Sequence, residues 1–442
     1  MTPSRLCPPP SSATDGAFLR AIRADRMSPL VQRHLATTGI VRELVADYVR
    51  WKDQDGSLVG YRAQVEHAGS VVSTYVTVRT APLPRLADEA ERLHHRAEED
   101  HAGLRAFAFV PAENVLLLAF PIDRAMHDLR RLVRPSKVRT LVAQCCPSLV
   151  PADHRFSKSR SSVQLASYRP ERRAVLHWRI GVVGPDGRAG AQPSLWIRCH
   201  AEGQAQRTRT ATDAALAAGL RVPPTLGAAH DRLRFEGHVE GRPWSPAPDA
   251  LHDTEAAAEA VAKLHAVPPP RTLPTHHALA ELDLVLAAVE DLVRLDPRLG
   301  SLGRQLADRL AHDVPPAAPA VFAHGDLHPG QVLLAEQGAG LVDFDRACSA
   351  PAAHDLATLI AQCADRDRVF GMASGRAFVS AYGRRAALPA PATLAWWTAC
   401  ALVRNATRPF RRLHPEWRTL AASLLQLAER TVLGADPEVA WS

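Results

Sequence analysis

The chain has 442 residues, enough for two or three domains with a sizeable buried core. Its hydrophobic fraction of 46% and charged fraction of 22% are typical of a globular protein, and no apolar run is long enough to span a membrane, so we expect no membrane partner. Seven cysteines without a CxxC pair argue against a cysteine metal site and a disulfide framework, and the lack of a signal-peptide pattern predicts a cytoplasmic location.

The net charge of +7 raises the question of nucleic-acid binding. The basic residues are nearly all arginines and are spread along the chain, whereas a nucleic-acid-binding protein gathers them on one face or one helix. We therefore expect no nucleic-acid partner.

The N-terminal third begins with a polar tail and continues as strands. Residues Met1–Gly16 contain three consecutive prolines and few apolar side chains, which predicts disorder, with order starting near Phe18. Three stretches of alternating apolar and polar residues then follow, separated by turns that contain glycine, and they predict a small antiparallel sheet. The predicted strands are 41–52, 58–67 and 71–80, followed by a helix at 87–103 and strands between 107 and 120.

A similar order of elements returns further along the chain. Three strands are predicted at 163–169, 174–183 and 194–199, then a helix at 204–218, then a strand that runs into a turn at 232–241. In both groups the third strand ends with an arginine, Arg79 in the first and Arg198 in the second. An internal repeat and a chance likeness of two sheet-plus-helix units are equally compatible with this pattern.

From Asp253 onward the pattern is mainly helical. Only three short apolar runs in this part are strand-like, Val321–Ala323, Val332–Leu334 and Leu341–Val342. A sheet-rich half followed by a helix-rich half predicts an α+β fold. The predicted helices are 254–267, with Asp253 as N-cap, 279–293, 299–311, 354–364, 376–382, 391–405 and 416–433.

The three short strands carry polar residues suited to phosphate chemistry. HGDLHPGQ follows the first strand and contains Asp326 and Gln331, and LVDFD places Asp343 after the last strand. Phosphoryl transfer needs a group that positions the acceptor hydroxyl and oxygen ligands for Mg²⁺. Asp326, Gln331 and Asp343 supply such a set.

The segments HGDLHPGQVLL, LVDFDRA and AAHDLATL together resemble the catalytic region of the aminoglycoside phosphotransferase (APH) family, small-molecule kinases with a protein-kinase-like, two-lobed fold. FEGHVEGRPW is similar to the hinge between the lobes, and AVAKLHAVPPP to the first helix of the second lobe. More distantly, the glutamine in HGDLHPGQ resembles that of bacterial maltokinases. The resemblance is strongest over 321–360 and extends over 163–433.

This resemblance implies ATP and Mg²⁺ as cofactors and a small molecule with a hydroxyl group as acceptor. By similarity, Asp326 is the catalytic residue, and Asp343 and Gln331 are the metal ligands. His324 and Asp355 would support the catalytic loop. The adenine would meet the backbone of the hinge from Glu236 to Val239.

Two departures from the family pattern concern the nucleotide phosphates. Arg198 stands where the third strand of the first lobe usually has a lysine, and the following helix has no glutamate, with Glu202 the one candidate just before it. The turn between the first two strands is not glycine-rich but carries Arg172 and Arg173, which suggests that Arg172 and Arg198 bind phosphate through side chains. A non-catalytic pseudokinase or nucleotide-binding interaction protein therefore remains an alternative.

The sequence thus predicts an ATP- and Mg²⁺-dependent O-phosphotransferase. A maltokinase-like sugar kinase is a second alternative, although DFDR stands here where DFEG is expected. Arginines outnumber acidic residues after Asp365, which favours a neutral or anionic acceptor over a polycationic aminoglycoside. Monomer and oligomer are equally compatible. The predicted domains are a disordered tail and lead-in (1–35), a cap or degenerate copy of the first lobe (36–150), a first lobe (151–243) and a helical second lobe (244–442).

Overall fold

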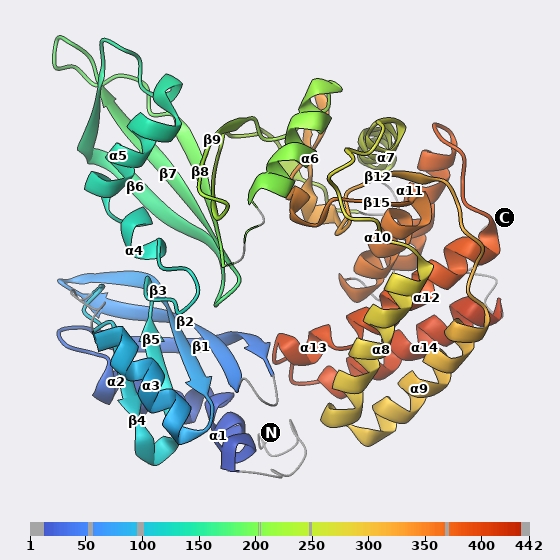
Figure 1. The fold of residues 1–442 in the computed structure, drawn as a ribbon, viewed down its shortest axis with the longest axis horizontal. Coiled ribbons are helices and arrows are strands. Elements are labelled where there is room, and N and C mark those ends of the chain that lie inside the picture. Colours follow the sequence, from blue (N-terminus) through green and yellow to red (C-terminus); the bar gives the residue numbers. More distant parts are fainter. Residues whose placement is uncertain are drawn as a thin grey trace. The chain divides into compact units, whose positions relative to one another are not determined.

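The computed structural model describes residues 13–51, 56–94, 101–201, 203, 205–246, 250–366 and 371–434. Strands dominate the first half and helices the second, which confirms the predicted α+β class (Figure 1). Across these ranges, no helix is both long and apolar enough to cross a membrane.

The chain divides into two compact units. The first runs to Glu202 and includes Phe410–Trp417, and the second comprises Gly203–Pro409 with Arg418 onward. The boundary between the two units falls inside the predicted first lobe, 151–243. The predicted domain boundaries stay predictions.

The first unit begins with two helices and an antiparallel sheet. Helix α1 starts at Ala13, within the stretch expected to be disordered, while Met1–Ser12 lie outside the described residues. The helix is ordered because Ala17, Phe18 and Ala21 are fully buried and Phe18 stacks on Trp51. The elements are α1 (Ala13–Ala21), α2 (Ala24–His34), β1 (Ile40–Arg50), β2 (Ser57–His67), β3 (Ser70–Thr80), α3 (Leu83–His94), β4 (Phe107–Val110) and β5 (Val115–Ala119).

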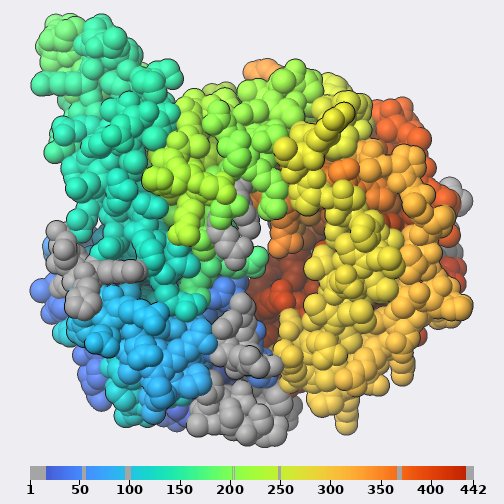
Figure 2. All heavy atoms as spheres, in the orientation of Figure 1, coloured from blue at the N-terminus to red at the C-terminus, as the bar shows by residue number. Residues whose placement is uncertain are grey.

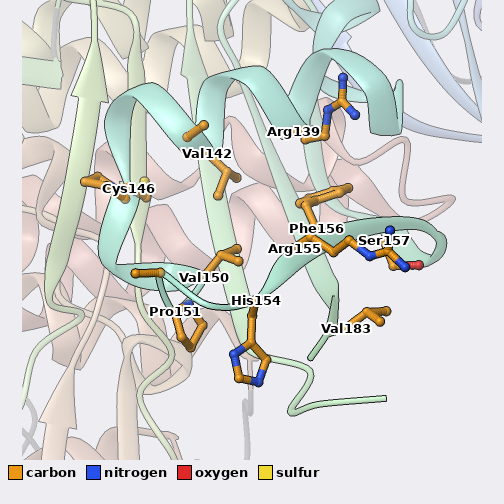
Figure 3. A pocket seen from close by; sticks show the side chains of 13 residues that line it. Arg139, Val142, Cys146, Val150, Pro151, His154, Arg155, Phe156, Ser157 and Val183 are labelled. Atoms are coloured by element: carbon orange, nitrogen blue, oxygen red, sulfur yellow. The ribbon is translucent and has the colours of Figure 1, made fainter. Parts of the chain in front are cut away.

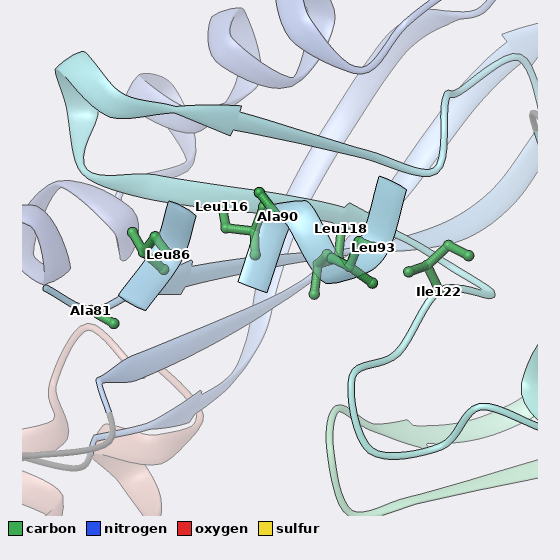
Figure 4. Packing of buried hydrophobic residues seen from close by; sticks show 7 residues of the cluster. All are labelled: Ala81, Leu86, Ala90, Leu93, Leu116, Leu118 and Ile122. Carbon is green, nitrogen blue, oxygen red and sulfur yellow. The ribbon is translucent and has the colours of Figure 1, made fainter. Parts of the chain in front are cut away.

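Helix α3 covers this first sheet with one apolar face. Leu86, Ala90 and Leu93 recur at helical spacing and pack against Leu116 and Leu118 of β5 (Figure 4). The strand order is β1-β2-β3-β5-β4, so α3 is the connection that lets β4 take the edge position beyond β5.

A second sheet has the same topology. Its strand order is β6-β7-β8-β10-β9, again three antiparallel strands, a helix and a final pair with the later strand inside. The shared order agrees with an internal repeat. β6 starts eight residues before the predicted Val163, with a register shift between Ser157 and Ser162. The elements are α4 (Leu129–Leu132), α5 (Pro135–Cys145), β6 (Arg155–Arg169), β7 (Arg173–Val183), β8 (Ser194–His200), α6 (Ala205–Ala217), β9 (Thr225–Ala229) and β10 (Leu233–Glu236).

Buried ion pairs hold the first unit together. Arg79 of β3 is 1% exposed, and its Nε lies 2.5 Å from Oε2 of Glu89 on α3. Glu171, in the β6–β7 turn, is also buried and forms ion pairs with Arg50 and Arg124. Buried charges need such partners because removal from water is costly. The cluster therefore links α3 and the first sheet to the β6–β7 turn.

The second unit is mainly helical, and Figure 2 shows α8 and α9 at its surface. The predicted helices are present; α9, for example, begins where Asp296 accepts hydrogen bonds from the amides of Arg298 and Leu299. The helices of this part of the chain are α7 (Leu251–Ala266), α8 (Ala278–Leu295), α9 (Pro297–His312), α10 (Ala352–Arg366), α11 (Gly371–Gly383), α12 (Pro391–Asn405), α13 (Arg408–Arg411) and α14 (Trp417–Leu433).

Short strands lie among these helices. β12 (Ala320–Ala323) pairs with β15 (Cys348–Pro351), and β13 (Val332–Ala335) pairs with β14 (Gly338–Leu341) and β11 (Arg242–Pro243). Phe322, Val332 and Leu341 are buried, so the strands form a rigid base. The loops that follow β12 and β14 carry Asp326 and Asp343.

Candidate active site

One buried carboxylate anchors the loop that carries Asp326. Asp355, in the first turn of α10, is 0% exposed. Its Oδ2 accepts a hydrogen bond from the backbone N–H of His324 at 2.6 Å, and its Oδ1 accepts one from that of Gly325 at 2.9 Å. Charge-assisted hydrogen bonds of this kind are among the strongest in proteins. They fix the two residues that precede Asp326.

His265 and Tyr382 complete this anchor, and the sequence provided no signal for either. His265 Nε2 lies 3.1 Å from Oδ2 of Asp355, and its Nδ1 lies 2.8 Å from the hydroxyl of Tyr382. Burial alone would raise the pKa of Asp355, but the hydrogen bond from His265 and the charges of the neighbouring histidines hold it well below its usual range. Asp355 is therefore a carboxylate at neutral pH and acts only as an acceptor.

His324 links the two functional loops. Its Nε2 lies 2.9 Å from the carbonyl oxygen of Val342, which can only accept, so Nε2 carries the proton. The ring packs against Phe344 with centroids 5.0 Å apart. The loop with Asp326 is thereby tied to the residue immediately before Asp343.

Gly325 allows the loop to approach Arg346 closely. Its φ is +80°, and a Cβ at this position would lie 1.9 Å from the carbonyl oxygen of Arg346. A side chain is excluded both by the left-handed backbone and by the neighbouring carbonyl.

Two loops carry the three candidate reactive residues. The loop after β12 carries Asp326 and Gln331, and the loop after β14 carries Asp343. The side chain of Asp326 is 36% exposed, and its Oδ2 lies 3.9 Å from Nε of Arg346. Asp343 has a left-handed backbone with φ of 73°, which turns the chain directly after Val342. Nε2 of Gln331 donates to Oδ2 of Asp343 at 3.5 Å. The base candidate is thus open to solvent, and the two candidate metal ligands are neighbours.

Gln331 has a feature that suits a cation ligand. The residue is 4% exposed, and its Oε1 has no hydrogen-bond partner in the described part of the chain. An unpaired buried oxygen is unfavourable, and Mg²⁺ prefers hard oxygen ligands such as amides and carboxylates. Gln331 and Asp343 together fit a Mg²⁺ ion with remaining positions for water or phosphate.

The predicted hinge residues lie in the same unit as Asp326. Glu236 ends β10 and is buried in an ion pair with Arg234. A Cβ added to Gly340 of β14 would lie 3.1 Å from Cγ1 of Val239, so the hinge passes close to the strand that leads to Asp343. The side chain of Glu236 is therefore structural, and backbone groups of the hinge are the candidates for a ligand.

Arg198 and Arg172 belong to the first unit. Arg198 lies on β8 opposite Val175 of β7 and is 9% exposed. Arg172 is exposed in the β6–β7 turn, next to the buried Glu171. The structure thus places these two arginines in the first unit and Asp326 with its supporting residues in the second unit.

The first unit also contains an open cavity of about 620 Å³. It lies between α5 and the ends of β6 and β7, with Val142, Phe156 and Val183 among its apolar lining and Arg139 and His154 among its polar lining (Figure 3). None of the predicted site residues lines it.

Comparison with known proteins supports the family resemblance. Residues 198–397 match the model of the Phosphotransferase enzyme family (APH). This segment contains Asp326, Gln331 and Asp343. The family match, with an antiparallel sheet followed by helices, confirms the predicted resemblance and the kinase-like fold.

Curated relatives include homoserine kinases. One from Bradyrhizobium diazoefficiens is 29% identical over 183 residues, covering 38% of this chain and 55% of the relative. One from Allorhizobium ampelinum is 28% identical over 181 residues, covering 38% of this chain and 56% of the relative. The chain thus spans about half the length of these relatives.

Solved structures with some similarity include two small-molecule kinases. A choline kinase from Cryptosporidium parvum has 12% identity and a TM-score of 0.49, covering 67% of this chain and 96% of that chain. An aminoglycoside phosphotransferase from Streptomyces rimosus has 21% identity and a TM-score of 0.38, covering 52% and 89%.

The geometry of Gly325 predicts a large difference between two glycine substitutions. Gly325→Ala introduces a clash with a backbone carbonyl, whereas Gly338→Ala places its Cβ in open space, although both glycines have positive φ. We expect Gly338→Ala to lower the free energy of unfolding by about 1–2 kcal/mol, and Gly325→Ala by more than about 3 kcal/mol. Urea unfolding of the two variants measures this. Equal effects would contradict the close approach of Gly325 to Arg346.

Proposed function

We propose that this chain transfers the γ-phosphoryl group of ATP to a hydroxyl group of a small molecule. The observation that carries the proposal is that Asp355 and His324 hold together the loop of Asp326 and the loop of Asp343, and that Gln331 contacts Asp343. The family match over 198–397 supports it.

Each acidic residue has a distinct role in this proposal. Asp326, exposed at the loop, accepts a hydrogen bond from the acceptor hydroxyl, orients it and takes its proton as the oxygen attacks phosphorus. Asp343 and Gln331 hold Mg²⁺, which neutralises phosphate charge when bound. His324 and Asp355 touch no reactant and keep the two loops in register.

The predicted nucleotide contacts are part of this proposal. Backbone groups between Glu236 and Val239 bind the adenine, and the guanidinium groups of Arg198 and Arg172 bind phosphate oxygens. Arginine suits this role because its planar fork can donate two parallel hydrogen bonds to a phosphate.

The acceptor is proposed to be neutral or anionic. The guanidinium of Arg346 lies 3.9 Å from Asp326 and is about half exposed, so it places a positive charge at the position where the acceptor binds. A polycation is repelled there, whereas an acceptor with a carboxylate or phosphate is attracted. The match to homoserine kinases makes hydroxy amino acids the first class to test, followed by sugars.

The roles of the two aspartates predict different defects. We expect Asp326→Asn to lower kcat by at least about 10²-fold while nucleotide affinity is unchanged, because only the proton acceptor is lost. Asp343→Asn should weaken Mg²⁺-dependent nucleotide binding as well. ADP release with a panel of hydroxy amino acids, sugars, amino alcohols and aminoglycosides, together with calorimetry of nucleotide binding, measures both. Full activity of Asp326→Asn would refute its assignment.

Asp186→Asn is the matched control for this pair, because Asp186 is 56% exposed in a turn of the first unit. It should leave both kcat and nucleotide binding unchanged. If no acceptor is turned over and ATP gives no thermal shift, the non-catalytic alternative gains over the proposed activity.

The proposed phosphate contacts predict that Arg198→Ala raises the dissociation constant of ATP by about tenfold or more, since a hydrogen bond to a charged group contributes about 1.5–3 kcal/mol. Arg172→Ala should have a smaller effect because Arg172 is exposed. Arg188→Ala, with a side chain that is 89% exposed in a loop, is the control. Calorimetric titration with ATP and Mg²⁺ tests this, and unchanged affinity in both Arg198→Ala and Arg172→Ala would exclude these contacts.

A further inference from the structure

A second group of polar side chains lies in the helical unit and takes no part in the proposed reaction. It consists of His276 in the loop before α8, Glu281 in the first turn of α8 and His354 in the first turn of α10. One nitrogen of each histidine and one carboxylate oxygen lie within 4.8 Å of one another. Residues far apart in the sequence thus converge on one point, because α8 and α10 both pack against α12 (Figure 1).

The distances within this cluster suit a small metal ion. Nε2 of His276 lies 2.8 Å, and Nδ1 of His354 lies 3.9 Å, from Oε2 of Glu281. Ligand atoms around a tetrahedral Zn²⁺ are separated by about 3.4 Å, given bonds of about 2.0–2.1 Å. The observed separations bracket this value, so a small movement of the side chains would complete the geometry.

His354 supplies an independent indication of a ligand. The residue is 4% exposed, and its Nδ1 has no hydrogen-bond partner in the described part of the chain. A buried nitrogen without a partner is destabilising, and in native proteins it calls for a bound water or ion.

We propose that Nε2 of His276, Oε2 of Glu281 and Nδ1 of His354 bind a divalent transition-metal ion, with Zn²⁺ as the best fit and water as the fourth ligand. Two imidazoles and one carboxylate form a donor set that suits zinc, whereas Mg²⁺ prefers oxygen ligands. On binding, the proton that His276 Nε2 shares with Glu281 moves to Nδ1 of the same ring, leaving Nε2 free to bind the metal. The site is therefore chemically distinct from the one at Asp343 and Gln331.

Arg404 of α12 shapes this site. Its Nε lies 2.8 Å from Oε1 of Glu281, so it occupies one carboxylate oxygen and directs the other toward the two imidazoles. Its positive charge also opposes a bound cation, so binding is weaker than in a structural zinc site without such a neighbour. The side chains of His276 and Arg404 are 17% and 19% exposed, which leaves a route for the ion and its water.

A bound ion would reinforce the anchor of the candidate active site. His354 directly precedes Asp355, and the backbone N–H of His276 donates to the carbonyl of Ser349 in β15 at 2.8 Å. β15 pairs with β12, which leads into His324. The metal would thus join the loop before α8 to the start of α10 and steady the carboxylate that holds the catalytic loop.

The test is calorimetric titration of Zn²⁺ into the chelator-treated full chain, without nucleotide. We expect one Zn²⁺ per chain, an increase in melting temperature, no displacement by Mg²⁺, and at least about tenfold weaker binding in both His276→Gln and His354→Gln. His312→Gln, an exposed histidine at the end of α9, is the matched control and should bind as the unmodified chain does.

The result that would overturn the proposal is no Zn²⁺ binding, or equal binding by His276→Gln. His276 is partly exposed in a loop, so this variant decides the question even if His354→Gln fails to fold. The readout is metal content and affinity, so it is independent of the proposed phosphotransferase activity.

Discussion

The carboxylate of Asp355 is the group on which the candidate active site depends. It is fully buried, yet it remains ionised because two backbone amides and the imidazole of His265 donate to its two oxygens. An ionised carboxylate in a protein interior is stable only when such donors replace its water. The two amide donors belong to the loop that carries Asp326, so the same hydrogen bonds stabilise the charge and position the loop.

The anchor at Asp355 also positions the loop that carries Asp343. His324 is held through its backbone by Asp355 and uses its side chain to hold Val342, so Asp343 is placed relative to Asp326. Gly325 permits the approach because any larger residue would meet the carbonyl of Arg346. Gln331 then donates from Nε2 to Asp343, and its Oε1 has no hydrogen-bond partner within the described ranges. Asp355, His324 and Gly325 thus decide where Asp326 and Asp343 lie.

The sequence predicted local features well and long-range partners poorly. Apolar periodicity and turn residues are local signals. They predicted the strands around Asp326 and Asp343, the helices, and the order of strands and helices along the chain. His265 and Tyr382 are 117 residues apart in the chain, and their contact has no local pattern. Glu89 is another example, because one of its partners is Arg124, 35 residues further along the chain. Polar residues within β6 hid its early start at Arg155.

The pairing of Arg79 with Glu89 is also relevant to how a nucleotide would be bound. A basic residue on the third strand and a glutamate on the next helix form the ion pair that positions phosphates in protein kinases. Here that combination occurs in the first sheet, where both groups are buried and also lie near Glu171 and Arg124. In the second sheet Arg198 occupies the corresponding strand, and the described helix α6 has no glutamate. The proposed nucleotide site therefore relies on an arginine of the second sheet.

Hydrogen–deuterium exchange over 322–331 measures whether Asp355 holds the loop of Asp326 through the amides of His324 and Gly325. We expect these two amides to exchange at least about tenfold faster in Asp355→Asn than in the unmodified chain, because each loses a hydrogen bond to a charged group. Equal exchange in the two proteins, with both folded, would contradict it.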